Sequence, residues 1–244
     1  MLRSDAPVLL RLLRGQPHRG THAERLQAFY GPQASHYDRF RERLLRGRSE
    51  LIERLAPPPG ARVVELGGGT GRNLLFFGER LARLAGVEVV DLCPALLEQA
   101  RRRAAHLPNV RVVEADATVY RPAEPADCVY FSYALTMIPD WGGAIENALT
   151  MLRPGGTLGV VDFYVSDAHG GPGAIRHDAF TRFFWPRWFA HDGVRLTPEH
   201  LRRLREALPD HSLLEQRGPL PYLPGLRVPY YVFVGRRKAG ANEP

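Results

Sequence analysis

A glycine-rich stretch at residues 63–73, VVELGGGTGRN, constrains the fold of this chain more than any other feature. It follows an apolar run typical of a buried strand and precedes an amphipathic run typical of a helix. Gly67, Gly69 and Gly71 occupy the connection between the two. Glycine lets a backbone approach a ligand closely, and the N-terminus of the following helix presents N–H groups to an electronegative atom. The stretch therefore predicts a strand, a ligand-binding turn and a helix in succession.

Runs of the same two kinds alternate further along the chain. The predicted strands span residues 62–66, 87–91, 110–114, 128–132 and 157–163. The predicted helices span residues 72–85, 94–105 and 143–152. Repeated strand–helix–strand units are typical of a parallel sheet with helices on both faces. After a helix at 197–207, a proline-rich connection joins strands at 212–216 and 230–235, which predicts an antiparallel end to the sheet.

The composition of the 244-residue chain is that of a globular protein. Its hydrophobic fraction is 44% and its charged fraction 24%, which excludes collagen-like, coiled-coil and wholly disordered chains. No stretch approaches the roughly 18–20 apolar residues that a membrane-spanning helix requires. Cys93 and Cys128 form neither a CxxC pair nor the disulfide framework of a secreted protein, so we expect a reducing, cytoplasmic location.

The formal net charge of +7 is compatible with an acidic partner, and Lys238 is the single lysine among 33 lysines and arginines. Because the arginines are spread along the chain and no recognition motif accompanies them, we expect no nucleic-acid partner. The nine histidines show no paired metal-ligand spacing. The sequence therefore predicts no metal site.

Two acids follow the next predicted strands. Asp91 ends the second strand, where a carboxylate can bind both hydroxyls of a ribose. Asp116 follows the third strand and can accept a hydrogen bond from the amino group of adenine, with the Ala117 N–H beside the ring. Either acid alone is more commonly a helix cap or a loop residue, but together with the glycine turn they favour a nucleoside-like ligand. Arg72 stands where a dinucleotide fingerprint requires its third glycine, which argues against NAD or FAD.

These features resemble the class I S-adenosylmethionine-dependent methyltransferases, whose first motif, E/D-x-G-x-G-x-G, begins here at Glu65. The turn at residues 152–158, LRPGGTL, is similar to the family's late motif. The resemblance implies a Rossmann-like α/β fold with a seven-stranded, mostly parallel sheet, an antiparallel last strand and helices on both faces. It implies S-adenosylmethionine as cofactor and S-adenosylhomocysteine as product. The cofactor-binding residues predicted on this basis are Arg48, Glu65, Gly67, Gly69, Gly71, Asp91, Leu92, Asp116, Ala117 and Ser132.

A narrower resemblance concerns the methyl acceptor. The N-methyltransferases of betaine-lipid synthesis convert diacylglyceryl homoserine to diacylglyceryl trimethylhomoserine by three methylations. The segments that are similar to those enzymes are residues 30–38, 41–48, 133–141, 184–189 and 221–231. This resemblance implies a lipid headgroup amine as acceptor. The alternatives are another phospholipid amine, a soluble small molecule, or a protein that binds S-adenosylmethionine without turnover.

The residues are compatible with methylation of an amine. The amine must lose its proton before it attacks the sulfonium methyl, and an aromatic pocket favours that loss by desolvation and stabilises the cationic product. Our candidates for positioning the acceptor are Tyr30, Tyr37 and Tyr133, for which core packing is the alternative role. Positioning supplies much of the rate of methyl transfer, so we expect no catalytic nucleophile, and His36 is only a weak candidate base. Arg48 is expected to pair with the cofactor's carboxylate or, alternatively, to be solvated.

The patterns divide the chain into three parts. We expect residues 1–56 to form a basic tail and a helical lid, and residues 237–244 to form a short tail. Between them, residues 57–236 are expected to form the S-adenosylmethionine-binding methyltransferase domain, with an aromatic-rich insertion at 165–195.

Part of this insertion bears on localisation. Residues 180–189 mix aromatic side chains with Arg182 and Arg187, a composition typical of an element at a membrane interface. A lid over the edge of the sheet is the alternative. We therefore expect a cytoplasmic protein that contacts the cytoplasmic face of a membrane peripherally.

Overall fold

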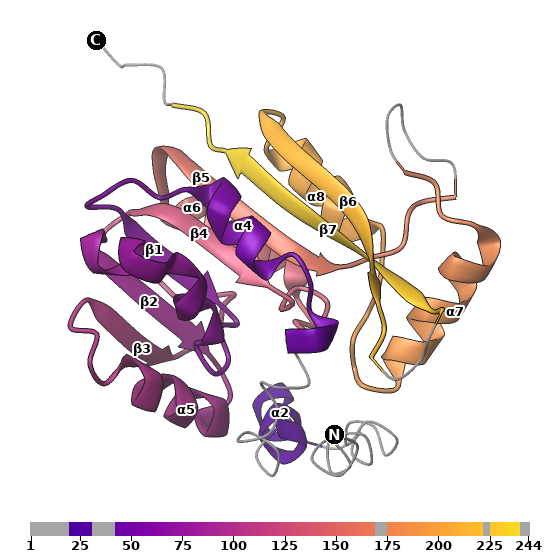
Figure 1. The fold of residues 1–244 in the computed structure, drawn as a ribbon, viewed down its shortest axis with the longest axis horizontal. Helices are drawn as coiled ribbons and strands as arrows, with labels where there is room; N and C mark the ends of the chain where they lie inside the picture. Colours follow the sequence, from indigo (N-terminus) through magenta and orange to yellow (C-terminus); the bar gives the residue numbers. More distant parts are fainter. Residues whose placement is uncertain (1–19, 31–41, 169–174, 222–224, 240–244) are drawn as a thin grey trace.

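The computed structural model describes residues 20–30, 42–168, 175–221 and 225–239. These residues form a seven-stranded sheet with the strand order β3-β2-β1-β4-β5-β7-β6 (Figure 1). The strands are β1 (Arg62–Leu66), β2 (Gly86–Asp91), β3 (Val110–Glu114), β4 (Ala126–Ser132), β5 (Leu152–Phe163), β6 (His211–Pro219) and β7 (Arg227–Arg236). The predicted α/β fold with a mostly parallel sheet is confirmed.

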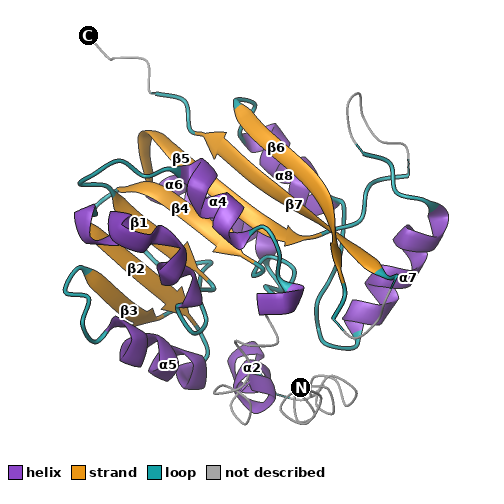
Figure 2. Cartoon of the chain, viewed as in Figure 1, coloured by secondary structure: helices purple, strands orange, loops and turns teal. Residues whose placement is uncertain are grey.

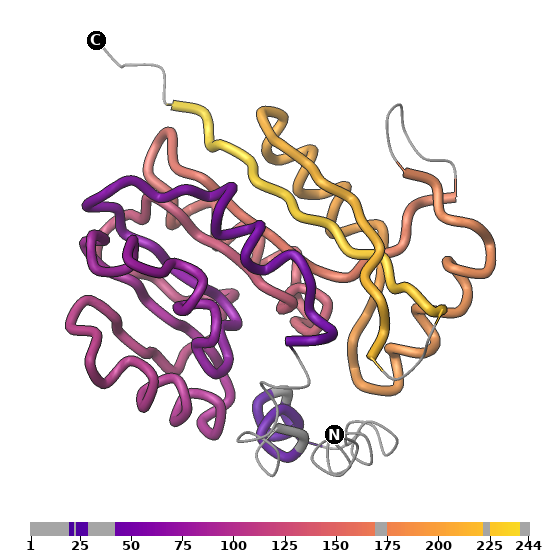
Figure 3. The backbone as a smooth tube through the Cα atoms, in the orientation of Figure 1, coloured from indigo at the N-terminus to yellow at the C-terminus, as the bar shows by residue number. Residues whose placement is uncertain are grey.

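The centre of the sheet is parallel and its C-terminal end is antiparallel. In β1, Val64 pairs in parallel with Glu88 of β2 and with Val129 of β4. Strand β7 runs antiparallel to both of its neighbours, since Val232 pairs with Val161 of β5 and with Leu214 of β6. The chain thus places its last strand between β5 and β6, as the tube in Figure 3 shows. The more apolar β7 is buried along most of its length, whereas the half-exposed β6 forms the edge.

Helices cover both faces of the sheet (Figure 2). One face packs against α4 (Arg48–Leu55), the 3-10 helix η2 (Arg72–Arg83) and α5 (Pro94–Ala104). The other face packs against α6 (Trp141–Met151) and α8 (Glu199–Ala207). Successive residues of a strand point to opposite faces, so Tyr130 joins the first core and Phe131 the second.

The segment after the glycine turn differs from its prediction. We expected an α-helix over residues 72–85, but η2 is a 3-10 helix that Gly78 interrupts with φ 54° and ψ −138°. This conformation is outside the helical region and is readily adopted by glycine, so the i to i−4 hydrogen bonds cannot continue through it. The helices predicted at 94–105, 143–152 and 197–207 are confirmed to within two residues at either end.

The aromatic-rich insertion contains a helix, α7 (Ala179–Ala190). Asp178 caps its N-terminus, because its carboxylate accepts a hydrogen bond from the Thr181 N–H at 2.7 Å. The helix stands at one end of the molecule, beyond β6 and β7 (Figure 1). Within the described part of the chain, no helix has the length and apolarity needed to cross a membrane.

The two described N-terminal helices occupy different places. Helix α4 packs directly on the sheet, where a Cβ added to Gly159 of β5 would lie 2.9 Å from Leu51 Cδ1. Helix α2 (His22–Tyr30) instead lies beside α5, with Leu26 packed against Cys93 and Leu96. Tyr37, His36 and residues 1–19 of the predicted tail and lid lie outside the described residues. The division of the chain into tail, lid and domain stays a prediction.

Candidate functional site

A cavity of about 220 Å³ opens at the carboxyl ends of β1 to β4. Seven of the residues predicted from the sequence line it. They are Gly67, Gly69, Asp91, Leu92, Asp116, Ala117 and Tyr133. Helix α2 contributes Leu26 to the wall, and the loop after β4 contributes Ala134, Met137, Ile138, Pro139 and Asp140. Ligands of open α/β sheets bind at this edge, so the cavity is the candidate functional site.

The glycine turn forms one wall of the cavity. Its three predicted glycines all have positive φ, at 70° for Gly67, 55° for Gly69 and 65° for Gly71. The N–H groups of Gly67 and Gly68 both donate to the Val90 carbonyl oxygen, at 2.8 and 3.0 Å, which ties the turn to β2. A Cβ at Gly67 would lie 2.5 Å from the Cβ of Ala134. The close approach of the turn to the loop after β4 therefore requires glycine at this position.

Asp91 connects the glycine turn to the end of β2. Its carboxylate accepts hydrogen bonds from the Gly69 N–H and the Cys93 N–H, both at 2.8 Å. A carboxylate has about four acceptor positions, so it can bind two backbone N–H groups and ribose hydroxyls at once. Asp91 thus orders the turn and presents a negative charge to the cavity.

Asp116 lies across the cavity, after β3. Its Oδ1 accepts from the N–H and the hydroxyl of Thr118, both at 2.8 Å. Its Oδ2 accepts no hydrogen bond from the described residues. Asp116 lines the cavity, so this oxygen could accept from an adenine amino group, and that predicted role stays a proposal. The donor and acceptor set of Asp91, Asp116 and the glycine turn therefore fits S-adenosylmethionine.

The other predicted cofactor residues are not among those that line the cavity in the described part of the chain. Gly71 packs against α5, where an added Cβ would lie 3.3 Å from Ala100 Cβ. Ser132 is buried at the end of β4, and its hydroxyl has no hydrogen-bond partner among the described residues. Arg48 and Glu65 belong to a buried cluster behind the glycine turn. A direct role for these four residues in cofactor binding stays a proposal.

Glu65 is the centre of that cluster. It is fully buried in β1 and accepts a hydrogen bond from the Asn73 side-chain amide at 2.6 Å. Burial raises the pKa of Glu65 to about 7, and the nearby Asp91 carboxylate adds to this rise. Hydrogen bonds from Asn73 and Tyr130 and the charge of the Arg48 guanidinium oppose it. Arg48 is itself buried and packs over the Phe76 ring at 5.3 Å, so the alternative of a solvated arginine is wrong. The acid of the first motif therefore joins β1 to the start of η2.

We expect the Glu65→Gln variant to lose part of the pH dependence of folding. Because the pKa of Glu65 is raised, the folded protein keeps a proton that the unfolded chain releases, and the free energy of unfolding falls as the pH rises from 4.5 to about 7. The variant is neutral throughout, so its free energy of unfolding relative to wild type should rise by on the order of 3 kcal/mol over this window. Denaturant unfolding of both proteins at several pH values measures this difference in the free energy of unfolding. The other titratable groups are the same in both proteins, so their contributions cancel in the difference. Identical pH dependence of the two proteins would contradict a buried acid with a raised pKa.

Tyr133, the third acceptor candidate, is held in a strained conformation at the cavity wall. Its φ is 55°, a left-handed value that costs about 1–2 kcal/mol for a residue with a side chain. Its hydroxyl donates to the Arg46 carbonyl oxygen at 2.7 Å, and its ring lies 4.6 Å from that of Phe163. Tyr133 therefore packs in the core and also lines the cavity, and its predicted role in positioning the acceptor stays a proposal. The side chain of Tyr30 lies outside the described residues.

Asp162 is a supporting residue that the sequence analysis missed. Its carboxylate accepts from the Thr136 N–H at 3.1 Å and from the Thr136 hydroxyl at 2.8 Å, which pins the loop that begins with Tyr133. Burial raises the pKa of Asp162 to about 7. An acid within the apolar run GVVDF of β5 was the available signal. Asp140, which lines the cavity and caps α6, was also missed.

The charge of the cavity wall is negative. Asp91, Asp116 and Asp140 line it, whereas no arginine, lysine or histidine does so in the described part of the chain. The described residues also contain no group of three histidine, cysteine or acidic side chains that could hold a metal ion. A site of this kind favours a cationic ligand over an anionic one.

A sheet of this order, with a glycine turn after β1 and acids after β2 and β3, is the architecture of class I S-adenosylmethionine-dependent methyltransferases. A family model described as "Methyltransferase domain" matches residues 37–213. The chain belongs to this family, and S-adenosylmethionine is its cofactor.

Known proteins resemble the chain in sequence and in fold. The trans-aconitate 2-methyltransferase of Enterobacter sp. is 32% identical over 117 residues, which cover 47% of this chain and 44% of that protein. The enzyme of the same name from Klebsiella pneumoniae is 29% identical over 78% of this chain and 79% of its own length. The solved phosphoethanolamine N-methyltransferase 2 of Haemonchus contortus, in complex with phosphomonomethylethanolamine and S-adenosylhomocysteine, aligns with a TM-score of 0.67 at 14% identity. That alignment covers 91% of this chain and 61% of the nematode chain. The chain thus spans less than half the length of the first of these curated relatives.

Proposed function

We propose that this protein methylates an amine, and that the amine is the headgroup amine of diacylglyceryl homoserine, which takes up to three methyl groups. The observation that supports an amine is the wall that the cofactor's ribose and adenine leave over, where Asp140 is the acid and no arginine, lysine or histidine among the described residues lines the cavity. An ammonium group is attracted to such a wall. A tricarboxylate such as trans-aconitate would be repelled by it, although curated relatives carry that substrate in their names.

The loop after β4 supports the choice of lipid amine. Residues 133–141 are one of the segments that resemble the betaine-lipid N-methyltransferases, and six of these nine residues line the cavity. One of the five segments that resemble those enzymes therefore forms part of the wall of the candidate site.

Methyl transfer to an amine requires that the amine is positioned against the methyl group and has lost its proton. Bound S-adenosylmethionine supplies an electrophilic methyl group on a sulfonium. Tyr133 lines the cavity, and a contact between its ring and an ammonium or a methylated ammonium would contribute about 0.5–2 kcal/mol. The apolar residues around it, Leu26 and Met137 among them, exclude water and so favour the neutral amine that attacks the methyl carbon. The proton released from the amine leaves to solvent or to a nearby carboxylate.

The expected result is stepwise methylation of the lipid. Purified protein is incubated with labelled S-adenosylmethionine and mixed vesicles that contain diacylglyceryl homoserine, and the lipid fraction is analysed by mass. We expect mass gains of one, two and three methyl groups. Parallel reactions contain phosphatidylethanolamine vesicles, free homoserine or trans-aconitate in place of the lipid.

The parallel reactions separate the alternatives. Methylated phosphatidylethanolamine would move the acceptor to another lipid amine, and methylated homoserine without vesicles would move it to a soluble amine. Methylated trans-aconitate, the activity named for the curated relatives, would overturn the amine proposal. Binding of S-adenosylmethionine without transfer to any of the four would favour a binding protein.

A further inference from the structure

Helix α7 has aromatic residues on two opposite faces. The inward face carries Thr181, Trp185 and Phe189 at intervals of four residues, and all three are buried. The outward face carries Phe180, Phe183 and Trp188, whose exposed fractions are 61%, 60% and 45%. A helix that is apolar all round is typical of an element with partners on both sides. The sheet is the partner of the inward face.

The outward side chains form one continuous surface, defined here as the α7 aromatic surface, of Phe180, Phe183, Phe184 and Trp188. The Phe184 ring stacks on Phe180 at 5.1 Å and contacts Trp188 at 5.5 Å. The Arg187 guanidinium lies over the Phe183 ring at 3.7 Å. The described chain has two other large exposed apolar side chains outside residues 175–188, Leu75 and Val119. Three of the six large exposed apolar side chains of the described residues therefore lie on this one helix.

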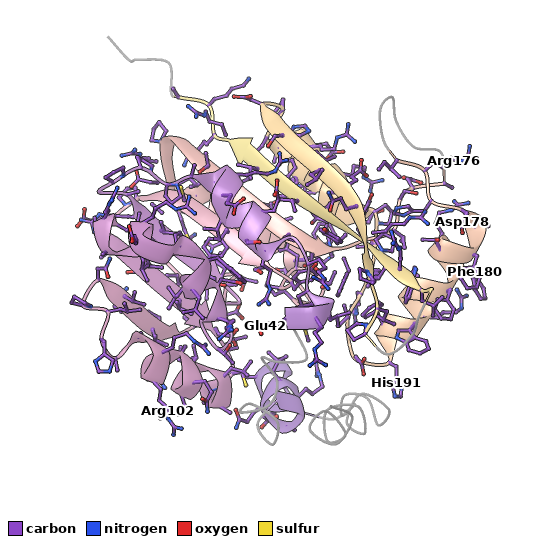
Figure 4. All side chains as sticks on the ribbon, in the orientation of Figure 1. Glu42, Arg102, Arg176, Asp178, Phe180 and His191 are labelled. Atoms are coloured by element: carbon purple, nitrogen blue, oxygen red, sulfur yellow. The ribbon has the colours of Figure 1, made fainter. Side chains whose placement is uncertain are left out.

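The charges around the α7 aromatic surface are mainly positive. Residues 175–195 carry four arginines against two aspartates. Asp178 is offset by Arg217, which lies 3.8 Å away. Figure 4 shows Arg176, Asp178 and Phe180 at the outer end of the molecule, far from Arg102 on α5. Aromatic rings together with arginines, whose stems are apolar and whose heads remain solvated, fit the interface of an anionic bilayer.

Aromatic contacts lead from this surface to the candidate site. Phe184 of this surface contacts Trp185 at 5.0 Å, and Trp185 packs on Phe189 at 5.9 Å. Phe189 packs on Phe163 at 4.9 Å, and Phe163 packs on the cavity residue Tyr133 at 4.6 Å. The loop after α7 is also joined to the cavity loop, since the Arg195 N–H donates to the Thr136 carbonyl oxygen at 2.7 Å. Direct packing and hydrogen-bond contacts therefore join the α7 aromatic surface to the loop that forms part of the cavity wall.

We propose that the α7 aromatic surface docks the protein on an anionic lipid bilayer. Phe180, Phe183 and Trp188 enter the interface, while Arg176 and Arg187 contact lipid phosphates. This inference goes beyond the proposed function, because docking requires neither the cofactor nor methyl transfer. Loss of docking and loss of methylation are therefore measured separately.

The test is sedimentation of the full chain with vesicles of phosphatidylcholine, with and without phosphatidylglycerol. We expect binding to the mixed vesicles, weaker binding at high salt, and at least about tenfold weaker binding by the Phe180→Ser/Phe183→Ser variant. The matched control is Val119→Ser, which removes a side chain that is 70% exposed in another part of the molecule and should bind as wild type. Thermal melting checks that both variants are folded.

A second measurement places the helix in the bilayer. Brominated lipids in the mixed vesicles should quench the fluorescence of Trp188, and the Trp188→Phe variant, which keeps the buried Trp185, should lose most of this quenching. Equal vesicle binding by wild type and the double serine variant, or no quenching, would overturn the proposal. Concentration-dependent dimers that the double serine variant abolishes, without vesicle binding, would overturn it in favour of a second copy of the chain.

Discussion

A Gly67→Ala variant is expected to lose measurable binding of S-adenosylmethionine and to melt well below the wild-type protein. The residue has a φ of 70°, a conformation that costs alanine about 1–2 kcal/mol. Its added Cβ would also lie 2.5 Å from the Cβ of Ala134, and relieving such overpacking costs typically about 1–3 kcal/mol. Because Gly67 and Ala134 both line the cavity, the shift that relieves the contact changes the shape of the site itself.

The matched control is Gly60→Ala. Gly60 has a similar φ of 79°, but no atom lies within 4 Å of an added Cβ. The free energy of unfolding of this variant should fall only by the conformational cost of alanine at this φ, about 1–2 kcal/mol. Its affinity for the cofactor should be unchanged. Melting curves and calorimetric titration with S-adenosylhomocysteine compare the two variants. If both glycine variants behave alike, the contact with Ala134 is not what requires glycine in the turn.

The Asp91→Ala variant is expected to bind S-adenosylmethionine roughly 5-fold to 150-fold more weakly than wild type, a loss of about 1–3 kcal/mol. The variant loses the carboxylate that faces the cavity. It also removes the acceptor of the Gly69 and Cys93 N–H groups, so the glycine turn loses its connection to the end of β2. Both effects act against the same ligand.

Calorimetry with S-adenosylhomocysteine measures the Asp91 effect, and Glu98→Ala is its control. Glu98 is an exposed acid on α5 that pairs with Arg102 at the surface and is not among the residues that line the cavity, so its loss removes the same charge outside the site. We expect Glu98→Ala to bind as wild type. Unchanged affinity in Asp91→Ala would remove Asp91 from the site and leave the fold assignment intact.

Much of the fold was predictable because its elements depend on local patterns. The strands of the parallel region are short apolar runs, and the turn after β1 needs glycine at positions that a single stretch of sequence reveals. Asp91 and Asp116 could be placed at one edge because the ends of parallel strands meet there. Gly78 marks the limit of this approach, since a lone glycine in an amphipathic run did not reveal that η2 would be broken and 3-10 in form.

The supporting residues depend on contacts between distant segments. Asp162 holds Thr136 across 26 residues, and Tyr133 donates its hydroxyl to Arg46 across 87. No local pattern encodes such pairings, because they arise only when strand order brings the segments together. The same holds for the burial of Arg48 and its packing over the Phe76 ring, which no local pattern around Arg48 indicated.

Local sequence patterns were thus sufficient for the class of fold and the residues that bracket the cavity, and the family resemblance of those residues implied the cofactor. Side-chain periodicity and glycine spacing act within a few residues and are visible in one dimension. The position of β7 inside the sheet, the strained Tyr133 and the outward aromatic face of α7 required the folded chain. They depend on which side chains are packed against each other and which stay exposed once the elements have assembled, and these contacts form only in the folded chain.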